Sequence, residues 1–111
     1  MQRSEVPFFE YRIDFFGFST SLDQAVAVEL KLRKWRRAFQ QALLYQLCAE
    51  YVYIAVPSMT AMRVDEVLLV EHSIGLIEVQ DSGRCVQRVE AKKSSMVRPH
   101  YREWCISYGG G

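Results

Sequence analysis

The chain has 111 residues, of which half are hydrophobic and 24% are charged, and its formal net charge is +1. This length supports one domain with one hydrophobic core, and the near-zero charge excludes a globally basic protein. No apolar run reaches the ~18 residues that a membrane-spanning helix needs, and the N-terminus lacks the apolar core of a secretory signal, so we expect a cytoplasmic protein with no membrane partner.

A β-hairpin is predicted in the first third of the chain. Residues 11–18 are rich in aromatic side chains and end near Gly17 and a Ser-Thr-Ser cluster. Residues 25–32 alternate apolar side chains with Ala27, Glu29 and Lys31. A polar turn joins the two strands, which favours antiparallel pairing.

Helices and strands then alternate. The i, i+3, i+4, i+7 spacing of Trp35, Ala38, Phe39 and Ala42 predicts a helix over residues 33–49. The expected elements after it are an internal strand at 51–56, a helix at 60–72, a hairpin of 75–79 with 84–89, and a short helix or strand at 101–108. This order predicts an α/β fold, with a central mixed sheet flanked by helices, in one domain over residues 1–108, followed by a disordered glycine tail at 109–111.

The three cysteines, Cys48, Cys85 and Cys105, are odd in number and widely spaced. They form no CxxC pair, so neither a zinc site nor a disulfide framework is indicated.

Basic side chains are concentrated just after the predicted hairpin. Residues 31–37 carry five basic side chains and no acidic one, namely Lys31, Arg33, Lys34, Arg36 and Arg37. Such a cluster can contact phosphates even when the total charge is near zero, and the alternative is a solvated helix face. Trp35 lies within this run and either stacks on a base or seats the helix in the core.

Three charged residues interrupt strands that should otherwise be apolar: Asp14, Glu29 and Lys31. Charges in the middle of a strand are costly to bury unless they are paired or bind a metal. Glu29 and Lys31 share a strand face, and hairpin pairing would place Asp14 beside Glu29. Two carboxylates suit Mg²⁺, with Mn²⁺ as a substitute, and a neighbouring ammonium suits the charge that develops on a phosphate.

The spacing of Asp14 from Glu29-Leu30-Lys31 resembles the D…ExK signature of the PD-(D/E)XK nuclease superfamily. The basic segment after it and the Gln41-xxx-Tyr45 pattern are similar to the RecB-like and lambda-exonuclease-like branch of that superfamily. The resemblance implies a restriction-endonuclease-like core and a metal-dependent nuclease, with DNA as the expected substrate. It also implies that the Leu30 carbonyl is a third metal ligand, and that Gln41 and Tyr45 support Lys31 or the substrate.

The chain departs from that superfamily before its first predicted strand. Members usually begin with a helix, whereas Pro7 argues against a helix in the short segment that precedes Tyr11. We therefore expect either that the N-terminal helix is reduced or missing or that the chain is one piece of a longer protein. In the first case a sheet face is expected to be open for a partner subunit, such as a second copy of the chain or a larger nuclease assembly. A catalytically silent nucleic-acid-binding or regulatory module, and a pure dimerisation domain, are the competing functions. The competing arrangement is a buried Asp14–Lys31 ion pair with Glu29 near the sheet edge.

Overall fold

The computed structural model describes residues 1–108, so the glycine tail expected at 109–111 lies outside the described residues. The elements in chain order are β1 (Gln2–Phe8), β2 (Tyr11–Ser19), β3 (Gln24–Leu30), α1 (Trp35–Tyr45), β4 (Tyr51–Pro57), α2 (Ser58–Ala61), α3 (Glu66–Glu71), β5 (Gly75–Val79), β6 (Cys85–Val89) and α4 (Pro99–Ser107). The longest helix in this part of the chain, α1, has 11 residues, and none of its helices has the length and apolar character needed to cross a membrane.

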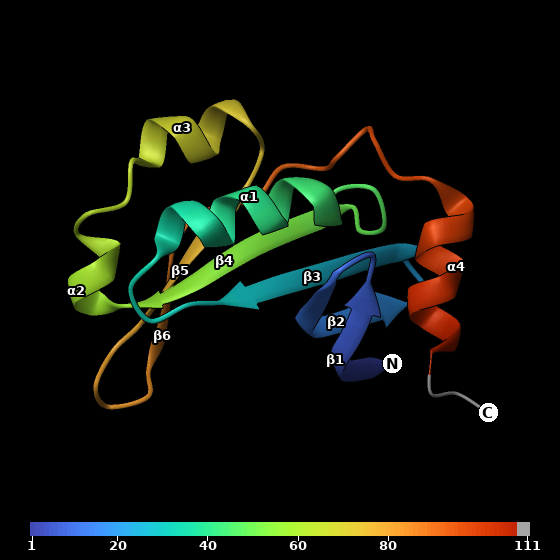
Figure 1. The fold of residues 1–111 in the computed structure, drawn as a ribbon, viewed down its shortest axis with the longest axis horizontal. Coiled ribbons are helices and arrows are strands. Elements are labelled where there is room, and N and C mark those ends of the chain that lie inside the picture. The colour runs from blue at the N-terminus through green and yellow to red at the C-terminus, as the bar shows by residue number, and fades with distance from the viewer. Residues whose placement is uncertain (109–111) are drawn as a thin grey trace.

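The six strands form one sheet in the order β1-β2-β3-β4-β5-β6, with the helices packed around it (Figure 1). The pairs β1–β2, β2–β3 and β5–β6 are antiparallel, whereas β3, β4 and β5 run parallel to one another. The predicted mixed sheet flanked by helices is confirmed, as is the internal position of the strand that was expected at 51–56. Because parallel strands end at the same edge of a sheet, the segments that follow β3, β4 and β5 lie close together.

Helix α1 packs on β3 and β4 through small side chains. Ala38 and Ala42 on α1 are fully buried, and so are Ala25 and Ala27 on the face of β3 that carries Glu29. The larger Val26 and Val28 alternate onto the opposite face and are only half-buried. The buried face of β3 is therefore the one with small and charged side chains, which lets the helix approach closely.

Three predicted boundaries were wrong. Strand β3 ends at Leu30, so Lys31 follows the strand, and α1 ends at Tyr45 rather than near residue 49. The helix expected over residues 60–72 is split into α2 and α3. The break has a local cause, because the side chain of Asp65 accepts a hydrogen bond from the Leu68 N–H at 3.2 Å and so begins a new helix.

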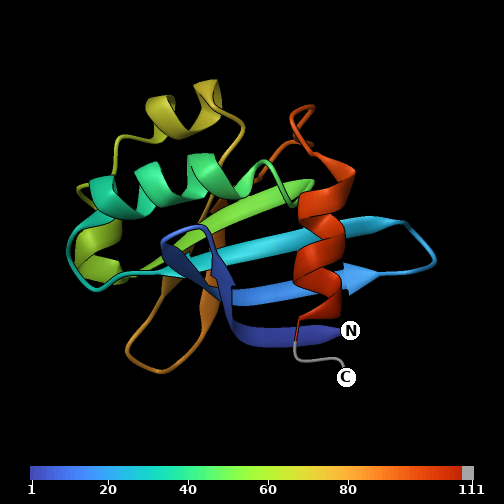
Figure 2. The same cartoon turned by 45° about the vertical axis from the view of Figure 1, so that its right-hand side comes forward.

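The N-terminal segment forms a strand that the sequence analysis did not predict. Strand β1 pairs along β2, and the hairpin tip curls toward the side of the sheet occupied by α1 and α4 (Figure 2). Glu5 has a φ of 55° within β1, a left-handed conformation that coincides with this change of direction. Helix α4 packs against β1, and the indole Nε1 of Trp104 donates a hydrogen bond to the Pro7 carbonyl at 3.0 Å. A C-terminal helix thus covers the N-terminal strand.

A partly buried ion-pair network fastens α4 to the sheet. Arg102 contacts Glu50 and Asp23, with N–O distances of 2.9 Å to each carboxylate. The other carboxylate oxygen of Glu50 accepts a hydrogen bond from the Ala25 N–H at 2.7 Å. The network therefore joins α4 to the starts of β3 and β4. The three thiols are free; Cys48 and Cys105 are buried and Cys85 is exposed.

We expect Arg102→Ala to lower the free energy of unfolding by about 3 kcal/mol, because it leaves the Glu50 carboxylate, whose side chain is 8% exposed, without its cation. Urea unfolding followed by circular dichroism measures this change. Arg88→Ala is the matched control, since Arg88 also pairs with two carboxylates, Glu66 and Glu78, but has a 41% exposed side chain. It should leave the urea midpoint nearly unchanged. Equal losses in the two variants would contradict a structural role for the buried network.

Candidate active site

Glu29 is the most unusual side chain in the sheet. It lies on β3 between β2 and β4, and it is only 3% exposed. The Tyr45 hydroxyl donates a hydrogen bond to its Oε1 at 3.0 Å, and the Lys31 ammonium lies 3.4 Å from its Oε2. Lys31 is itself partly exposed, so Glu29 has one buried neutral partner and one cation that reaches the surface.

The surroundings of Glu29 disfavour its charged form. Burial, and then the negative charge of Asp14, raise the pKa of Glu29 to about 7, against the lowering effects of Tyr45 and Lys31. This carboxyl group therefore keeps its proton to a higher pH than an ordinary glutamate does. Burial and the nearby Glu29 charge also raise the pKa of Tyr45, so its phenol stays protonated and remains a donor.

Asp14 reaches Glu29 from the neighbouring strand. Phe15 pairs with Val28, so Asp14 lies one residue beyond the last registered pair of β2 and β3. Its Oδ2 accepts a hydrogen bond from the Leu30 N–H at 2.8 Å, which fixes the carboxylate at the end of the ladder. The charge of Asp14 acts on Glu29, as its contribution to the pKa shows.

The competing arrangement, with Asp14 and Lys31 as the ion pair and Glu29 near the edge, is wrong. Lys31 pairs with Glu29, and Glu29 lies on an interior strand.

A groove of about 910 Å³ adjoins these residues. Lys31 and Gln41 line it, together with Leu30, whose N–H binds Asp14, whereas Asp14 and Glu29 are not among its lining residues. Gln41 is 7% exposed, and its Oε1 has no hydrogen-bond partner among residues 1–108. The groove therefore brings together a cation and a buried acceptor that is free to bind a donor such as water.

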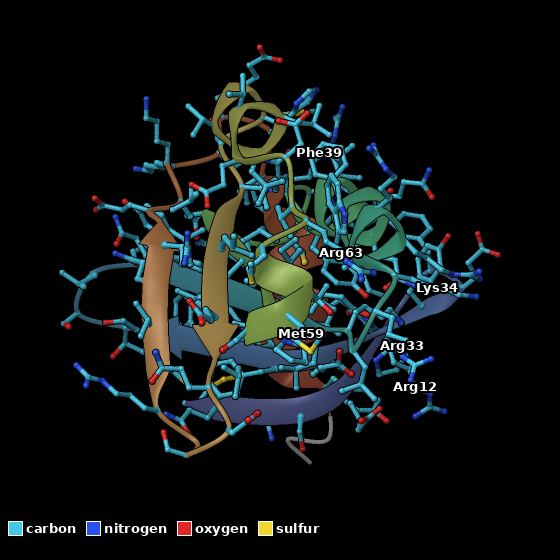
Figure 3. The ribbon with its side chains drawn as sticks, turned by 90° about the vertical axis from the view of Figure 1, so that its left-hand side faces the viewer. Arg12, Arg33, Lys34, Phe39, Met59 and Arg63 are labelled. Carbon is cyan, nitrogen blue, oxygen red and sulfur yellow. The ribbon has the colours of Figure 1, made fainter. Side chains whose placement is uncertain are left out.

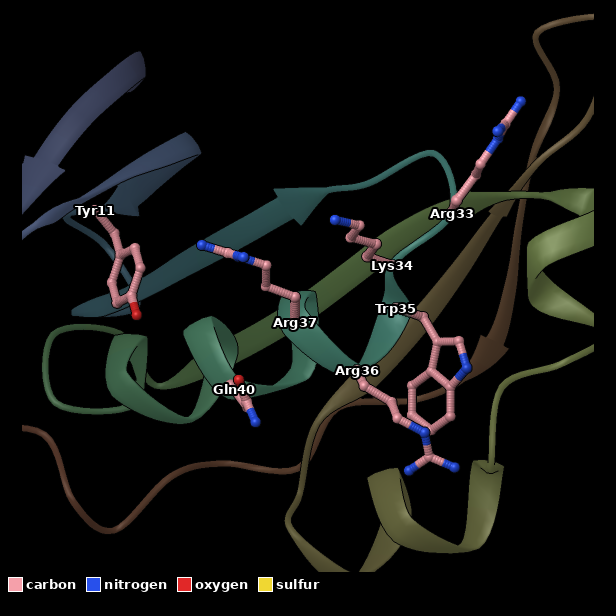
Figure 4. A pocket seen from close by; sticks show the side chains of 7 residues that line it. All are labelled: Tyr11, Arg33, Lys34, Trp35, Arg36, Arg37 and Gln40. Carbon is pink, nitrogen blue, oxygen red and sulfur yellow. The ribbon is translucent and has the colours of Figure 1, made fainter.

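Four of the five basic side chains of residues 31–37 line this groove, and Arg36 does not. Arg33, Lys34 and Arg37 line the groove with Lys31, and they also line an adjoining hollow of about 690 Å³. Figure 4 shows Arg37 extending from α1 toward Tyr11. Tyr11 lines both hollows, and the sequence analysis did not single it out, although an aromatic residue shortly before Asp14 was the available signal.

Arg36 and Trp35 line the adjoining hollow of about 690 Å³ but not the groove itself. Trp35 is 7% exposed and packs in the core, so of its two predicted roles the structural one is confirmed. The Arg36 guanidinium lies 4.6 Å from the centroid of the Trp35 ring, on the side of α1 turned away from Tyr11 (Figure 4). Of the four predicted phosphate contacts, Arg36 is the one that does not line the groove with Lys31.

Asp14 and Glu29 are the side chains at this end of β3 that could hold a divalent cation. Burial and the charge of Asp14 both disfavour the charged form of Glu29, and the partly exposed Lys31 ammonium offsets them only in part. Within residues 1–108, no group of three or more histidine, cysteine or acidic side chains could hold a metal ion. An ion here would depend on Asp14, Glu29, a main-chain oxygen such as that of Leu30, and waters, and Mg²⁺ accepts such a set.

Comparison with known proteins identifies the fold only. No family model matches the chain, and no curated protein matches it. A solved structure of a protein of unknown function from Silicibacter pomeroyi is similar with a TM-score of 0.65 and 20% identity, over 96% of this chain and 68% of that one. SfsA of Pyrococcus furiosus, solved in complex with Ca²⁺, is a more distant neighbour with a TM-score of 0.45 and 14% identity, over 86% of this chain and 54% of that one.

The raised pKa of Glu29 predicts how stability changes with pH. A carboxyl group whose pKa is higher in the folded state binds more protons when folded, so it makes the protein less stable as pH rises from about 4.5 to about 7. The scale is roughly 3 kcal/mol for a shift of this size. In EDTA, Glu29→Gln should remove this decline and be the more stable form above pH 7. The Gln side chain keeps the acceptor for Tyr45. Parallel stability curves for the two proteins between pH 4 and 8 would show that Glu29 titrates normally.

Proposed function

We propose that this chain is a divalent-metal-dependent phosphodiesterase that hydrolyses nucleic acid, with DNA as the expected substrate. The observation that carries the proposal is Glu29, a buried carboxylate that is influenced by the charge of Asp14 and paired with Lys31, which lines a groove rich in basic side chains. A purely structural ion pair has no need of a second carboxylate that raises the pKa of the first. A cation-binding site does, because the bound ion compensates both charges.

Each residue has a defined task in this proposal. Asp14 and Glu29 would hold Mg²⁺, or Mn²⁺ in its place, with the Leu30 carbonyl as a further oxygen ligand. When bound, the ion would polarise a phosphoryl oxygen and lower the pKa of a water molecule. Tyr45 holds Glu29 in place through its hydroxyl. The hydrogen bond from Leu30 N–H does the same for Asp14.

The residues that line the groove would act on the substrate directly. Lys31 presents its ammonium to the groove, where it can donate a hydrogen bond to a phosphate oxygen or to the attacking water. The unpartnered Oε1 of Gln41 can accept a hydrogen bond from that water and so orient it toward the phosphorus. Arg33, Lys34 and Arg37 would bind flanking phosphates.

The two kinds of site residue are separable by mutation. Asp14→Asn should lose Mg²⁺ binding and cleavage together, because it removes a ligand. Lys31→Ala should lower the cleavage rate by about 10²-fold or more while Mg²⁺ binding is kept or tightened, because an ammonium repels the ion. Calorimetry with Mg²⁺, and cleavage of labelled single- and double-stranded DNA in Mg²⁺, Mn²⁺ or EDTA, measure the two effects.

Two results would count against the enzyme. Mg²⁺ binding without cleavage of DNA or RNA leaves a silent binding module. If neither Mg²⁺ nor Mn²⁺ binds, and Asp14→Asn leaves the affinity for nucleic acid unchanged, the chain resembles the nucleases in fold alone.

The basic side chains of the groove make a second prediction possible. Arg37→Ala should weaken DNA binding and flatten the plot of log affinity against log salt by about one unit, since one phosphate contact is lost. Arg36→Ala is the matched control, because Arg36 is adjacent to Arg37 in the sequence and has the same charge, but its guanidinium lies over Trp35. It should leave the slope unchanged. Equal slopes in Arg37→Ala and the unmodified protein would show that these basic side chains form a solvated helix face and do not bind phosphates.

A further inference from the structure

Leu32 stands where three surface hollows meet. It lines the groove of about 910 Å³ with Lys31 and Gln41. It also lines a hollow of about 610 Å³ formed with Met59, Thr60 and Arg63, which we call the α2 hollow. A third hollow of about 390 Å³, at the ends of β4 and β5, shares Leu32 as well. The groove and the α2 hollow share Leu32 and Arg33, so a ligand that extends from one into the other passes along these two side chains.

The apolar side chains at this junction are unusually exposed. Among the large hydrophobic residues of the described chain, the three most exposed are Met62 at 82%, Leu32 at 77% and Met59 at 76%. Single exposed apolar residues are common on protein surfaces. Leu32 and Met59 are not isolated in this way, because they line the same hollow. Leu32 also directly follows Lys31, the lysine of the candidate active site.

The backbone beneath Leu32 is held in place. The hydroxyl of Thr60, a residue that is 8% exposed, donates a hydrogen bond to the Leu32 carbonyl. The Lys31 N–H donates to the Ala55 carbonyl at 3.1 Å. The backbone of Lys31 and Leu32 is thus tied to β4 and α2, while the Leu32 side chain projects into solvent.

The charge around the junction is mainly positive. Five basic side chains and two acidic ones line the three hollows: Lys31, Arg33, Lys34, Arg37 and Arg63 against Glu10 and Asp81. Figure 3 shows Met59 at the end of the molecule that faces the viewer, with Arg33 and Arg63 near it. The surface therefore suits a ligand that combines negative charges with apolar faces.

We propose that Leu32 and Met59 contact unpaired bases, so that the substrate is a single-stranded or locally unpaired nucleic acid. This inference rests on the proposed function, and it adds the substrate class. The bases of an intact duplex are stacked and hide their faces, whereas an unpaired base offers a flat apolar surface. Aliphatic and thioether side chains pack against such faces when they separate neighbouring bases. A strand bound through its phosphates by Arg33 and Arg37 would place a base on Leu32 beside Lys31.

The test compares DNA with and without bases. Affinity is measured by fluorescence anisotropy in EDTA, with a labelled single strand, the same strand carrying abasic sites, and the duplex. We expect the protein to prefer the single strand over the other two. Leu32→Ser should weaken binding of the single strand by about tenfold, the scale of removing one leucine from an apolar contact, while binding of the abasic strand is unchanged. Met59→Ser should act in the same direction.

Leu22→Ser is the matched control, because Leu22 is 68% exposed but lies in the turn before β3, at the opposite end of that strand. It should bind all three DNAs like the unmodified protein. Equal affinity for normal and abasic strands, or no effect of Leu32→Ser, overturns the inference even if DNA is cut in Mg²⁺. No binding and no cleavage of any DNA overturns the proposed function with it. Loss of self-association in Leu32→Ser, with DNA binding intact, would make this surface a protein interface and also overturn the inference.

Discussion

The burial of one carboxylate constrains the centre of this fold. Glu29 is almost inaccessible on an interior strand, where an unpaired charge would be costly. Its compensation is incomplete, because Tyr45 contributes a neutral donor and Lys31 a partly solvated cation. The packing of α1 depends on the same residues, since alanines on α1 and β3 allow the close approach that brings the Tyr45 hydroxyl to Glu29. The site and the core are therefore one structure.

The parallel middle of the sheet explains why the groove lies where it does. Strands β3, β4 and β5 end at one edge, where the last residue of β4, Pro57, and the residues that follow β3 and β5, Lys31 and Gln80, line adjoining hollows. Ligands of open α/β sheets usually bind outside the carboxyl ends of the strands. The basic residues before and at the start of α1 lie at the same edge, close to the carboxylates of the candidate site. Positive charge is therefore concentrated locally although the net charge of the whole chain is only +1.

The opposite end of the molecule is organised for stability. Helix α4 closes over β1, and the Arg102 network ties it to β3 and β4. This fastening joins residues from both ends of the chain, and it lies at the start of β3 while the candidate site lies at its end. A substitution at Arg102 is thus expected to change stability and leave the chemistry of Glu29 alone, which separates the two regions experimentally.

The sequence by itself determined the features that depend on local pattern. Alternation predicted the β2–β3 hairpin, continuous hydrophobicity predicted the internal strand β4, and helical spacing predicted α1 with Trp35 on its buried side. The antiparallel register that carries Asp14 toward the end of β3 also followed from the strand pairing. Only the tertiary structure decided which face of β3 is buried, that Lys31 pairs with Glu29, and that Arg36 points away from the groove. The cover of the N-terminal strand β1 by α4, from the far end of the chain, was likewise decided by the tertiary structure. These outcomes depend on contacts between residues distant in the chain, and no local periodicity encodes them.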